Sequence, residues 1–170
     1  MTKAETPDVS SMQAQAQQQH QWLKKFLGEW TFEGEASMPG EPATKFSGSE
    51  RVRALGDLWI IAESSGQMPD GGTAEMVMTL GYDPQRKGYV GTWVSSTMTY
   101  MWVYSGTLDT TGKCLILEST GPNMSSPGTM MRSQDIIEFE SDDHRIMRSQ
   151  MLGDDGQWYP MMEIHFRKKA

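Results

Sequence analysis

The sequence has little of what would mark a disulfide-rich, membrane-spanning or exported protein. It contains a single cysteine, Cys114, which excludes an internal disulfide framework. No apolar run approaches the roughly 20 residues that a membrane-spanning helix needs. The N-terminal segment, MTKAETPDVSSMQAQAQQQHQ, lacks the apolar core and the cleavage-site pattern of a signal peptide. These absences predict a cytoplasmic location.

Basic residues are also scarce relative to acidic ones. The chain has 15 Lys and Arg residues against 22 Asp and Glu residues, which gives a net charge of -7. An acidic surface repels phosphate backbones and anionic lipid headgroups, so we expect neither nucleic acid nor a membrane as a partner. The length of 170 residues, of which 37% are hydrophobic, fits one domain with a substantial core. Nothing in the composition indicates the oligomeric state.

A polar N-terminal segment precedes a short helical pattern. Residues 1–19 are rich in Gln, Ala and Ser, which predicts a mobile arm in front of a single domain at 20–170. Ser10 or Ser11 is a candidate N-cap, and Gly28 is a natural helix end. Apolar residues at helical spacing lie between these limits at Trp22, Leu23, Phe26 and Leu27. The pattern predicts one amphipathic helix that packs on a larger body.

After Gly28 the apolar pattern changes to a period of two. Ten strands are predicted, at Glu29–Met38, Thr44–Leu55, Leu58–Gln67, Thr73–Tyr82, Lys87–Ser96, Met101–Asp109, Lys113–Gly121, Thr129–Glu140, His144–Gly153 and Gln157–Lys168. Clusters of Gly, Pro, Asp and Asn separate them and are typical of tight turns. Closure removes the exposed edges of so long a meander. The sequence therefore predicts an all-β, antiparallel up-and-down barrel of about ten strands, with the helix over one opening.

The last predicted strand does not reveal which of its faces is inside. One face carries only apolar residues, namely Trp158, Pro160, Met162, Ile164 and Phe166. The other face is mixed and carries Tyr159, Met161, Glu163, His165 and Arg167. Burial of apolar side chains favours the first face, but barrels that hold ligands mix polar and apolar groups inside. Alternation leaves both arrangements open.

Two features at the ends of the predicted barrel resemble the closure signature of lipocalins and their calycin relatives. The motif GEW at Gly28–Trp30 opens the first strand directly after the helix, and Arg167 lies near the end of the last strand. The resemblance implies that the Arg167 guanidinium lies over the Trp30 indole and seals one end of the barrel, a cation–π contact.

Further motifs make the resemblance more specific. In order along the chain they are MTLGYDPQRKGYVGTW, TMTYMWVYSGTLD, DIIEF, DDHRIM and MEIHFRK. Together they resemble an uncharacterised bacterial family known as domain of unknown function 1579, from about residue 20 to the C-terminus. The resemblance implies a lipocalin-like barrel and no established activity.

A barrel of about ten strands is too wide for its inward-facing side chains to fill completely, which predicts an interior pocket. Aromatic and Met side chains suit its wall, and we expect Tyr89, Trp93 and Met78 there. The alternative pair Trp102 and Tyr104 lies on the next predicted strand; if the pleat is regular, one of the two aromatic pairs faces inward.

A polar group is also expected in this pocket. If the mixed face of the last strand turns inward, Glu163 is its main polar group, and Arg148 from the neighbouring strand pairs with it. The expected partner of such a pocket is a small, mostly apolar ligand.

Two other functions are weighed beside ligand binding. An enzyme could use the same cavity with Glu163 or His165 as acid or base, although no catalytic constellation, metal site or cofactor motif is legible. The three histidines, at His20, His144 and His165, are scattered along the chain. Alternatively, the barrel is filled solid and the protein is an interaction module.

Overall fold

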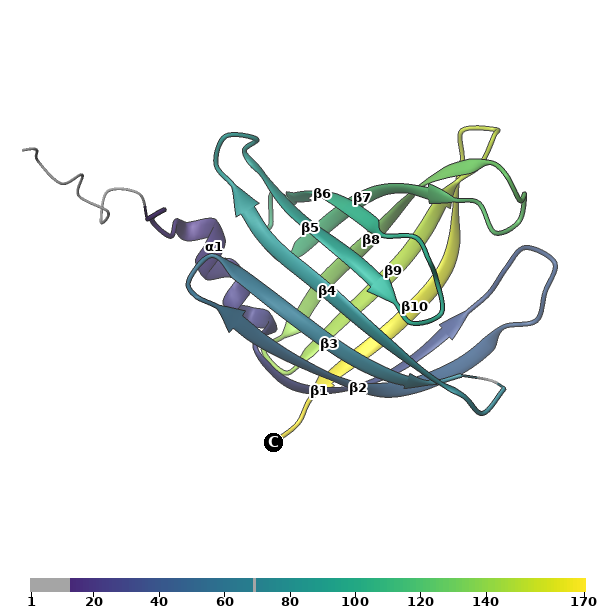
Figure 1. The fold of residues 1–170 in the computed structure, drawn as a ribbon, viewed down its shortest axis with the longest axis horizontal. Coiled ribbons are helices and arrows are strands. Elements are labelled where there is room, and N and C mark those ends of the chain that lie inside the picture. Colours follow the sequence, from purple (N-terminus) through teal and green to yellow (C-terminus); the bar gives the residue numbers. More distant parts are fainter. Residues whose placement is uncertain (1–12, 69) are drawn as a thin grey trace, which may run out of the picture.

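The computed structural model describes residues 13–68 and 70–170 and shows ten antiparallel strands closed into a barrel (Figure 1). The strands are β1 Gly28–Ala36, β2 Thr44–Leu55, β3 Trp59–Gln67, β4 Thr73–Asp83, β5 Gly88–Ser95, β6 Trp102–Leu108, β7 Cys114–Pro122, β8 Met130–Ser141, β9 His144–Leu152 and β10 Trp158–Lys168. Each predicted strand is present, with ends shifted by one or two residues. The predicted barrel class and strand number are thus confirmed.

The topology is a simple meander. Each strand pairs with the next one along the chain, and β1 pairs with β10 to close the barrel. In this closing pair Phe32 lies opposite Phe166, so that both aromatic side chains face inward. Full closure leaves no unpaired strand edge in the sheet, which removes the aggregation hazard that such an edge carries.

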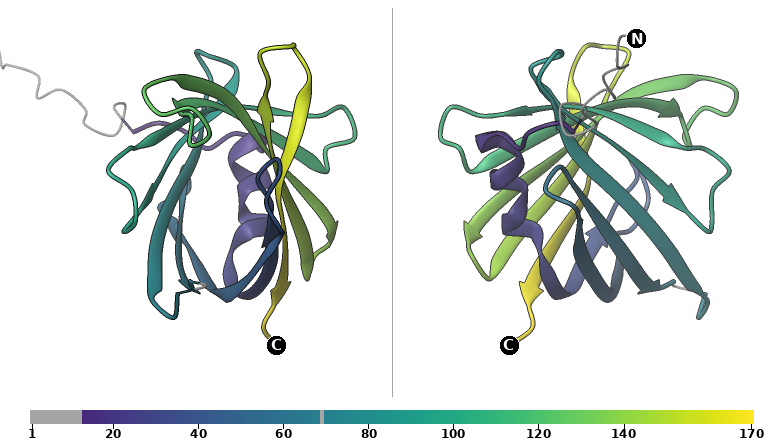
Figure 2. Two further views of the ribbon diagram at one scale, coloured as in Figure 1. Left: turned by 90° about the vertical axis from the view of Figure 1, so that its right-hand side faces the viewer. Right: turned by 60° about the vertical axis from the view of Figure 1, so that its left-hand side comes forward.

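A short helical segment precedes the barrel and lies across one of its ends (Figure 2). It consists of the α-helix α1 Gln18–Leu23 and the 3-10 turn η2 Lys24–Phe26. The helix is shorter than predicted, because residues 13–17 are not helical. The predicted N-caps Ser10 and Ser11 lie outside the described residues, as does most of the predicted arm 1–19, whose last two residues belong to α1.

Three contacts hold this segment on the barrel. The His20 imidazole lies 3.1 Å from the Tyr82 carbonyl oxygen, and the Trp22 indole N–H donates to the Gly112 carbonyl at 2.8 Å. Phe26 is fully buried, and its ring lies 5.0 Å from that of Phe139. Trp22 itself is only half-buried. We call this the helix end of the barrel and the opposite end the open end.

Gly28 links the helical segment to β1. Its φ of +124° suits glycine, and a Cβ there would lie 2.7 Å from Cε of Lys168. The glycine therefore allows the chain to turn sharply into the first strand beside the end of the last. The expected helix end at Gly28 is replaced by a 3-10 turn that ends at Phe26.

The cation that covers Trp30 is Arg145 and not Arg167. The Arg145 guanidinium carbon lies 4.3 Å from the Trp30 ring centroid and 4.2 Å from that of Phe166. Arg167 is exposed, because the residue before it, Phe166, points inward and alternation turns the next side chain out. The predicted cation over Trp30 exists, but β9 supplies it. Lys168 adds a second, longer contact of 5.3 Å to the same indole ring.

No helix within residues 13–68 and 70–170 is long and apolar enough to cross a membrane.

Candidate functional site inside the barrel

The inward faces of β4, β5 and β6 bring a Met and two Trp side chains together in the open half of the barrel. Met78 lies opposite Trp93, and Trp93 lies opposite Trp102, in neighbouring strands. The Trp102 ring lies over Gly121 of β7, where a Cβ would come within 2.3 Å of it. The glycine therefore makes room for the indole inside the barrel. Met78 and Trp93 were both predicted to line the interior, and the structure places them side by side.

The polar centre of the interior is Asp135, which lies on the inward face of β8. The Tyr104 hydroxyl donates to one of its carboxylate oxygens at 2.6 Å, and the Ser149 hydroxyl donates to the other. These three side chains come from β8, β6 and β9. Asp135 is flanked along its own strand by inward-facing Ile137 on the helix side and Ser133 on the open side.

Burial dominates the protonation equilibria of this cluster. It raises the pKa of the Asp135 carboxyl, while the hydrogen bonds from Ser149 and Tyr104 oppose that shift. Burial also raises the pKa of the Tyr104 phenol well above its ordinary value, and the neighbouring Asp135 raises it further. Tyr104 is therefore a hydrogen-bond donor at neutral pH, and its hydroxyl fixes the orientation of the carboxyl group.

Solvent reaches the interior around this cluster. Met78, Met147 and Asp135 lie near the middle of their strands and point inward, yet each keeps a partly accessible surface. Because these side chains face away from the outer surface, their exposure reports on space inside the barrel. Two other inward-facing residues of the open half, Trp93 and Met162, are also partly accessible. The open half of the interior is therefore less completely buried than the helix end.

The interior at the helix end is closed by contrast. Trp30, Phe26, Leu80 and Leu115 have no measurable exposure, and Arg145 is 2% exposed. Arg145 forms a buried ion pair with Glu50, whose other carboxylate oxygen accepts a hydrogen bond from Ser64 at 3.1 Å. Burial lowers the pKa of the Arg145 guanidinium, and the neighbouring Glu50 opposes that shift.

Tyr89 belongs to this packed end and not to the accessible space. It is 2% exposed, its hydroxyl donates to the Gln19 carbonyl at 3.3 Å, and its ring contacts those of Trp22 and Tyr82. Burial, and then the neighbouring Tyr82, raises the pKa of Tyr89 to about 12. Tyr89 faces inward as predicted, but three residues of β5 separate it from Trp93, so the two do not line one pocket.

The expectation that only one aromatic pair faces inward is wrong. Direct pairing of Trp93 with Trp102 and of Gly91 with Tyr104 places both pairs on the inner face. Alternation along one strand determines which of its residues share a face. The register between two strands determines whether a given residue of one strand lies on the same face of the sheet as a given residue of the other. The hairpin turn at residues 96–101 sets this register.

Glu163 and Arg148 lie on the outer face of the barrel, so they are not interior partners. Their side chains are 49% and 43% exposed, and Arg148 Nε donates to Glu163 at 3.0 Å. The predicted pairing between the two residues is therefore present, but in solvent. The physical reason is that the apolar face of the last strand, with Ile164 and Phe166, takes the inward position.

The acid–base pair considered for an enzyme lies outside the barrel as well. His165 Nε2 lies 2.9 Å from Glu163, and its Nδ1 lies 3.0 Å from Nε2 of His144. The hydrogen bond from His165, and then that from Arg148, lowers the pKa of the Glu163 carboxyl. The group belongs to a surface network of β8, β9 and β10 and does not face the cavity. In the described part of the chain, no three His, Cys, Asp or Glu side chains gather as metal ligands.

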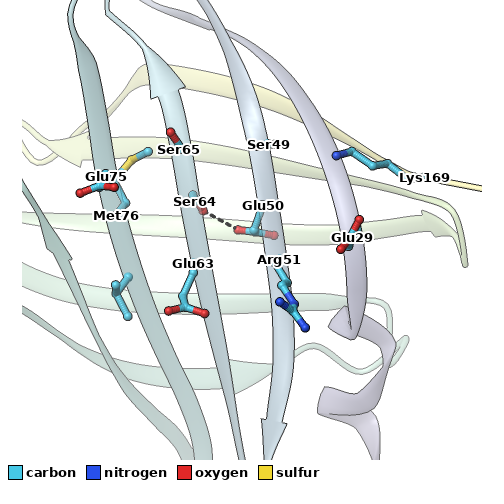
Figure 3. A pocket seen from close by; sticks show the side chains of 11 residues that line it. Glu29, Ser49, Glu50, Arg51, Glu63, Ser64, Ser65, Glu75, Met76 and Lys169 are labelled. Atoms are coloured by element: carbon cyan, nitrogen blue, oxygen red, sulfur yellow. Dashed lines mark hydrogen bonds between the residues drawn. The ribbon is translucent and has the colours of Figure 1, made fainter.

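A separate hollow of about 440 Å³ lies over β1 to β4 (Figure 3). Its lining consists mostly of outward-facing residues, and Glu29, Arg51 and Glu63 lie opposite one another across β1, β2 and β3. Cross-strand pairs of opposite charge stabilise a sheet. The hollow is therefore mainly a charged outer surface, although the inward-facing residues Glu50, Ser64 and Met76 also take part in its lining.

Comparison with known proteins agrees with the fold. The family described as "Protein of unknown function (DUF1579)" matches residues 15–168. The chain belongs to this family. No curated protein sequence matches it.

Two solved structures share the barrel architecture. The crystal structure of Rv2717c from M. tuberculosis superposes with a TM-score of 0.64 at 15% identity, and the match covers 92% of this chain and 100% of that one. The S-type phycobiliprotein lyase CPES from Guillardia theta gives a TM-score of 0.58 at 10% identity, covering 88% of this chain and 92% of that one. At such identities the likeness concerns the fold alone, which is a closed antiparallel β-barrel.

Of the central residues of the site, Asp135 and Ser149 were not singled out from the sequence, and Tyr104 was named only as a member of the alternative aromatic pair. A signal for Asp135 was present, since it alternates with the apolar residues Ile137 and Phe139 in the motif DIIEF. A carboxyl at an apolar position of a strand is worth attention, because buried carboxyl groups are rare without a partner. No comparable signal marked Tyr104 or Ser149, whose contact with Asp135 depends on strand register.

Proposed function

We propose that this protein binds a small, mostly apolar molecule in the open half of the barrel. The supporting observation is the partial exposure of the inward-facing, mid-strand side chains Met78, Met147 and Asp135. Ligand sites are mainly apolar and carry a few fixed polar groups, and the side chains that face this interior have such a composition. Met side chains suit such a wall, because they adapt to ligands of different shape.

The two other functions are less well supported. An interaction module requires a barrel filled solid, whereas solid packing characterises only the helix end. An enzyme using the cavity with Glu163 or His165 would need these groups inside, and both lie on the outer face. Asp135, in contrast, is a carboxyl group on the inner face of the barrel and is held by two hydroxyl donors.

The proposal is tested with the neutral fluorescent probe N-phenyl-1-naphthylamine, whose emission rises in apolar surroundings. We expect saturable binding to the wild-type protein. Trp93→Ala should weaken it about fivefold or more, which corresponds to about 1 kcal/mol of lost contact. Val94→Ala is the matched control, because Val94 is the next residue of β5 and points outward. Absence of saturable binding, or equal affinity in both variants, would refute the proposal.

A further inference from the structure

The barrel interior contains charged side chains in two different situations. Arg145 and Glu50 compensate each other at the helix end, where Trp30, Phe26 and Phe166 cover the guanidinium. With the ion pair formed and the rings packed over it, the Arg145 charge is not open to a molecule in the accessible space. Asp135 lies among side chains that solvent reaches.

Asp135 has no cationic partner among the residues that the structure describes. Its two hydrogen-bond donors, Tyr104 and Ser149, are neutral hydroxyl groups. None of the ion pairs formed by the described residues includes it. Buried carboxylates are normally paired with a cation, because hydroxyl donors alone only partly replace the hydration that burial removes.

The surroundings of Asp135 also suit a positive charge. Tyr104 contacts the carboxylate directly, and Trp93 and Trp102 belong to the same half of the interior. Aromatic faces attract cations through their quadrupole, and the attraction grows when water is excluded. Soft Met sulfur atoms, such as those of Met78 and Met147, line the same space and tolerate an irregular ligand.

We infer that the ligand carries a cationic group, a protonated organic amine attached to an apolar body, and that this group pairs with Asp135. The inference rests on the proposed function, since it specifies the ligand class of the same interior site. A fatty acid or other apolar anion is disfavoured, because it would meet the Asp135 carboxylate while Glu50 and the aromatic rings keep Arg145 out of reach.

The test compares three probes of nearly equal shape by calorimetry on the full chain. They are 1-naphthylmethylamine, which is protonated at neutral pH, the neutral 1-naphthylmethanol and the anionic 1-naphthoate. We expect the amine to bind at least about tenfold more tightly than the alcohol, and the anion to bind most weakly. Because the net charge of -7 attracts any cation, the measurement is made at about 0.15 M salt, which screens charges beyond about 8 Å.

Two variants test whether the preference for the amine depends on the Asp135 carboxyl group. Asp135→Asn preserves size and an acceptor oxygen, and it should lower the affinity for the amine about tenfold while changing that for the alcohol less than about threefold. Glu140→Gln is the matched control, because it removes the same charge from an exposed, outward position of β8 and should change neither affinity.

The outcomes separate the inference from the proposed function. If the alcohol binds as tightly as the amine, the cationic ligand class is wrong. If Asp135→Asn leaves the preference for the amine intact, the pairing with Asp135 is wrong. In both cases binding in the barrel stands. If none of the three probes binds and N-phenyl-1-naphthylamine does not bind either, both fail. The three-probe comparison on the wild-type protein decides the matter even if Asp135→Asn does not fold.

Discussion

The two ends of the barrel are built from the same strands but differ in how they bury charged and aromatic side chains. At the helix end the buried Arg145 is paired with Glu50, and the rings of Trp30 and Phe26 have no measurable exposure. In the open half a carboxyl group faces partly accessible Met and Trp side chains and has only neutral donors. The first arrangement stabilises the fold. The second retains a feature that costs stability, which is typical of a site kept for function.

The largest effect should come from truncating the packed end. Phe26→Ala removes a fully buried ring and should lower the free energy of unfolding by about 3–5 kcal/mol, measured by chemical denaturation. Met78→Ala in the open half should cost only about 1–2 kcal/mol, because solvent already reaches that side chain. Equal losses in the two variants would show that the two ends are packed alike.

Breaking the buried ion pair should have an effect of similar or slightly smaller size. Glu50→Gln leaves the Arg145 guanidinium buried without a counter-charge and should destabilise the protein by about 3 kcal/mol. Adding Arg145→Met should restore part of this loss, since the unpaired charge is then gone. The exposed pair Arg53–Glu63 is the control, and Glu63→Gln should change the free energy of unfolding by about 0.5 kcal/mol or less.

Asp135→Asn, unlike the substitutions above, should stabilise the protein. Folding raises the pKa of the Asp135 carboxyl above the value of about 4 that an Asp has in the unfolded chain. Ionisation of Asp135 therefore destabilises the folded protein once the pH rises above about 4. The variant should therefore gain stability relative to wild type at about pH 7, and this gain should shrink as the pH falls to about 4. Thermal unfolding across this range measures it. A variant that loses stability at neutral pH would mean that the carboxylate is structural.

The smallest effect is expected from the surface network that includes Glu163. Hydrogen bonds from His165 and Arg148 lower the pKa of this carboxyl, but it is about half exposed, so solvent screens the interaction. Glu163→Gln should change the free energy of unfolding by about 0.5 kcal/mol or less and leave probe affinity unchanged. A marked loss of probe binding would indicate that the outer face of β10 takes part in the site.

The strands could be predicted from the sequence because their determinants are local. Alternation of apolar residues and the Gly, Pro, Asp and Asn clusters between them are sufficient to locate ten strands within one or two residues. The shorter helix shows where local signals fail, because the polar residues 13–17 fit a helix without the tertiary contacts that would hold one there.

The sequence by itself determined the strand order, the turns and the residues that share a face within each strand. Only the tertiary structure decided which face is inside, because that depends on the register between strands and on β-bulges such as the one between Pro160 and Met162. Closure of the barrel placed Arg145 rather than Arg167 over Trp30 and turned Glu163 into solvent. The same closure brought Asp135 to Tyr104, 31 residues away along the chain, since contacts across a barrel interior leave no periodic trace in the sequence.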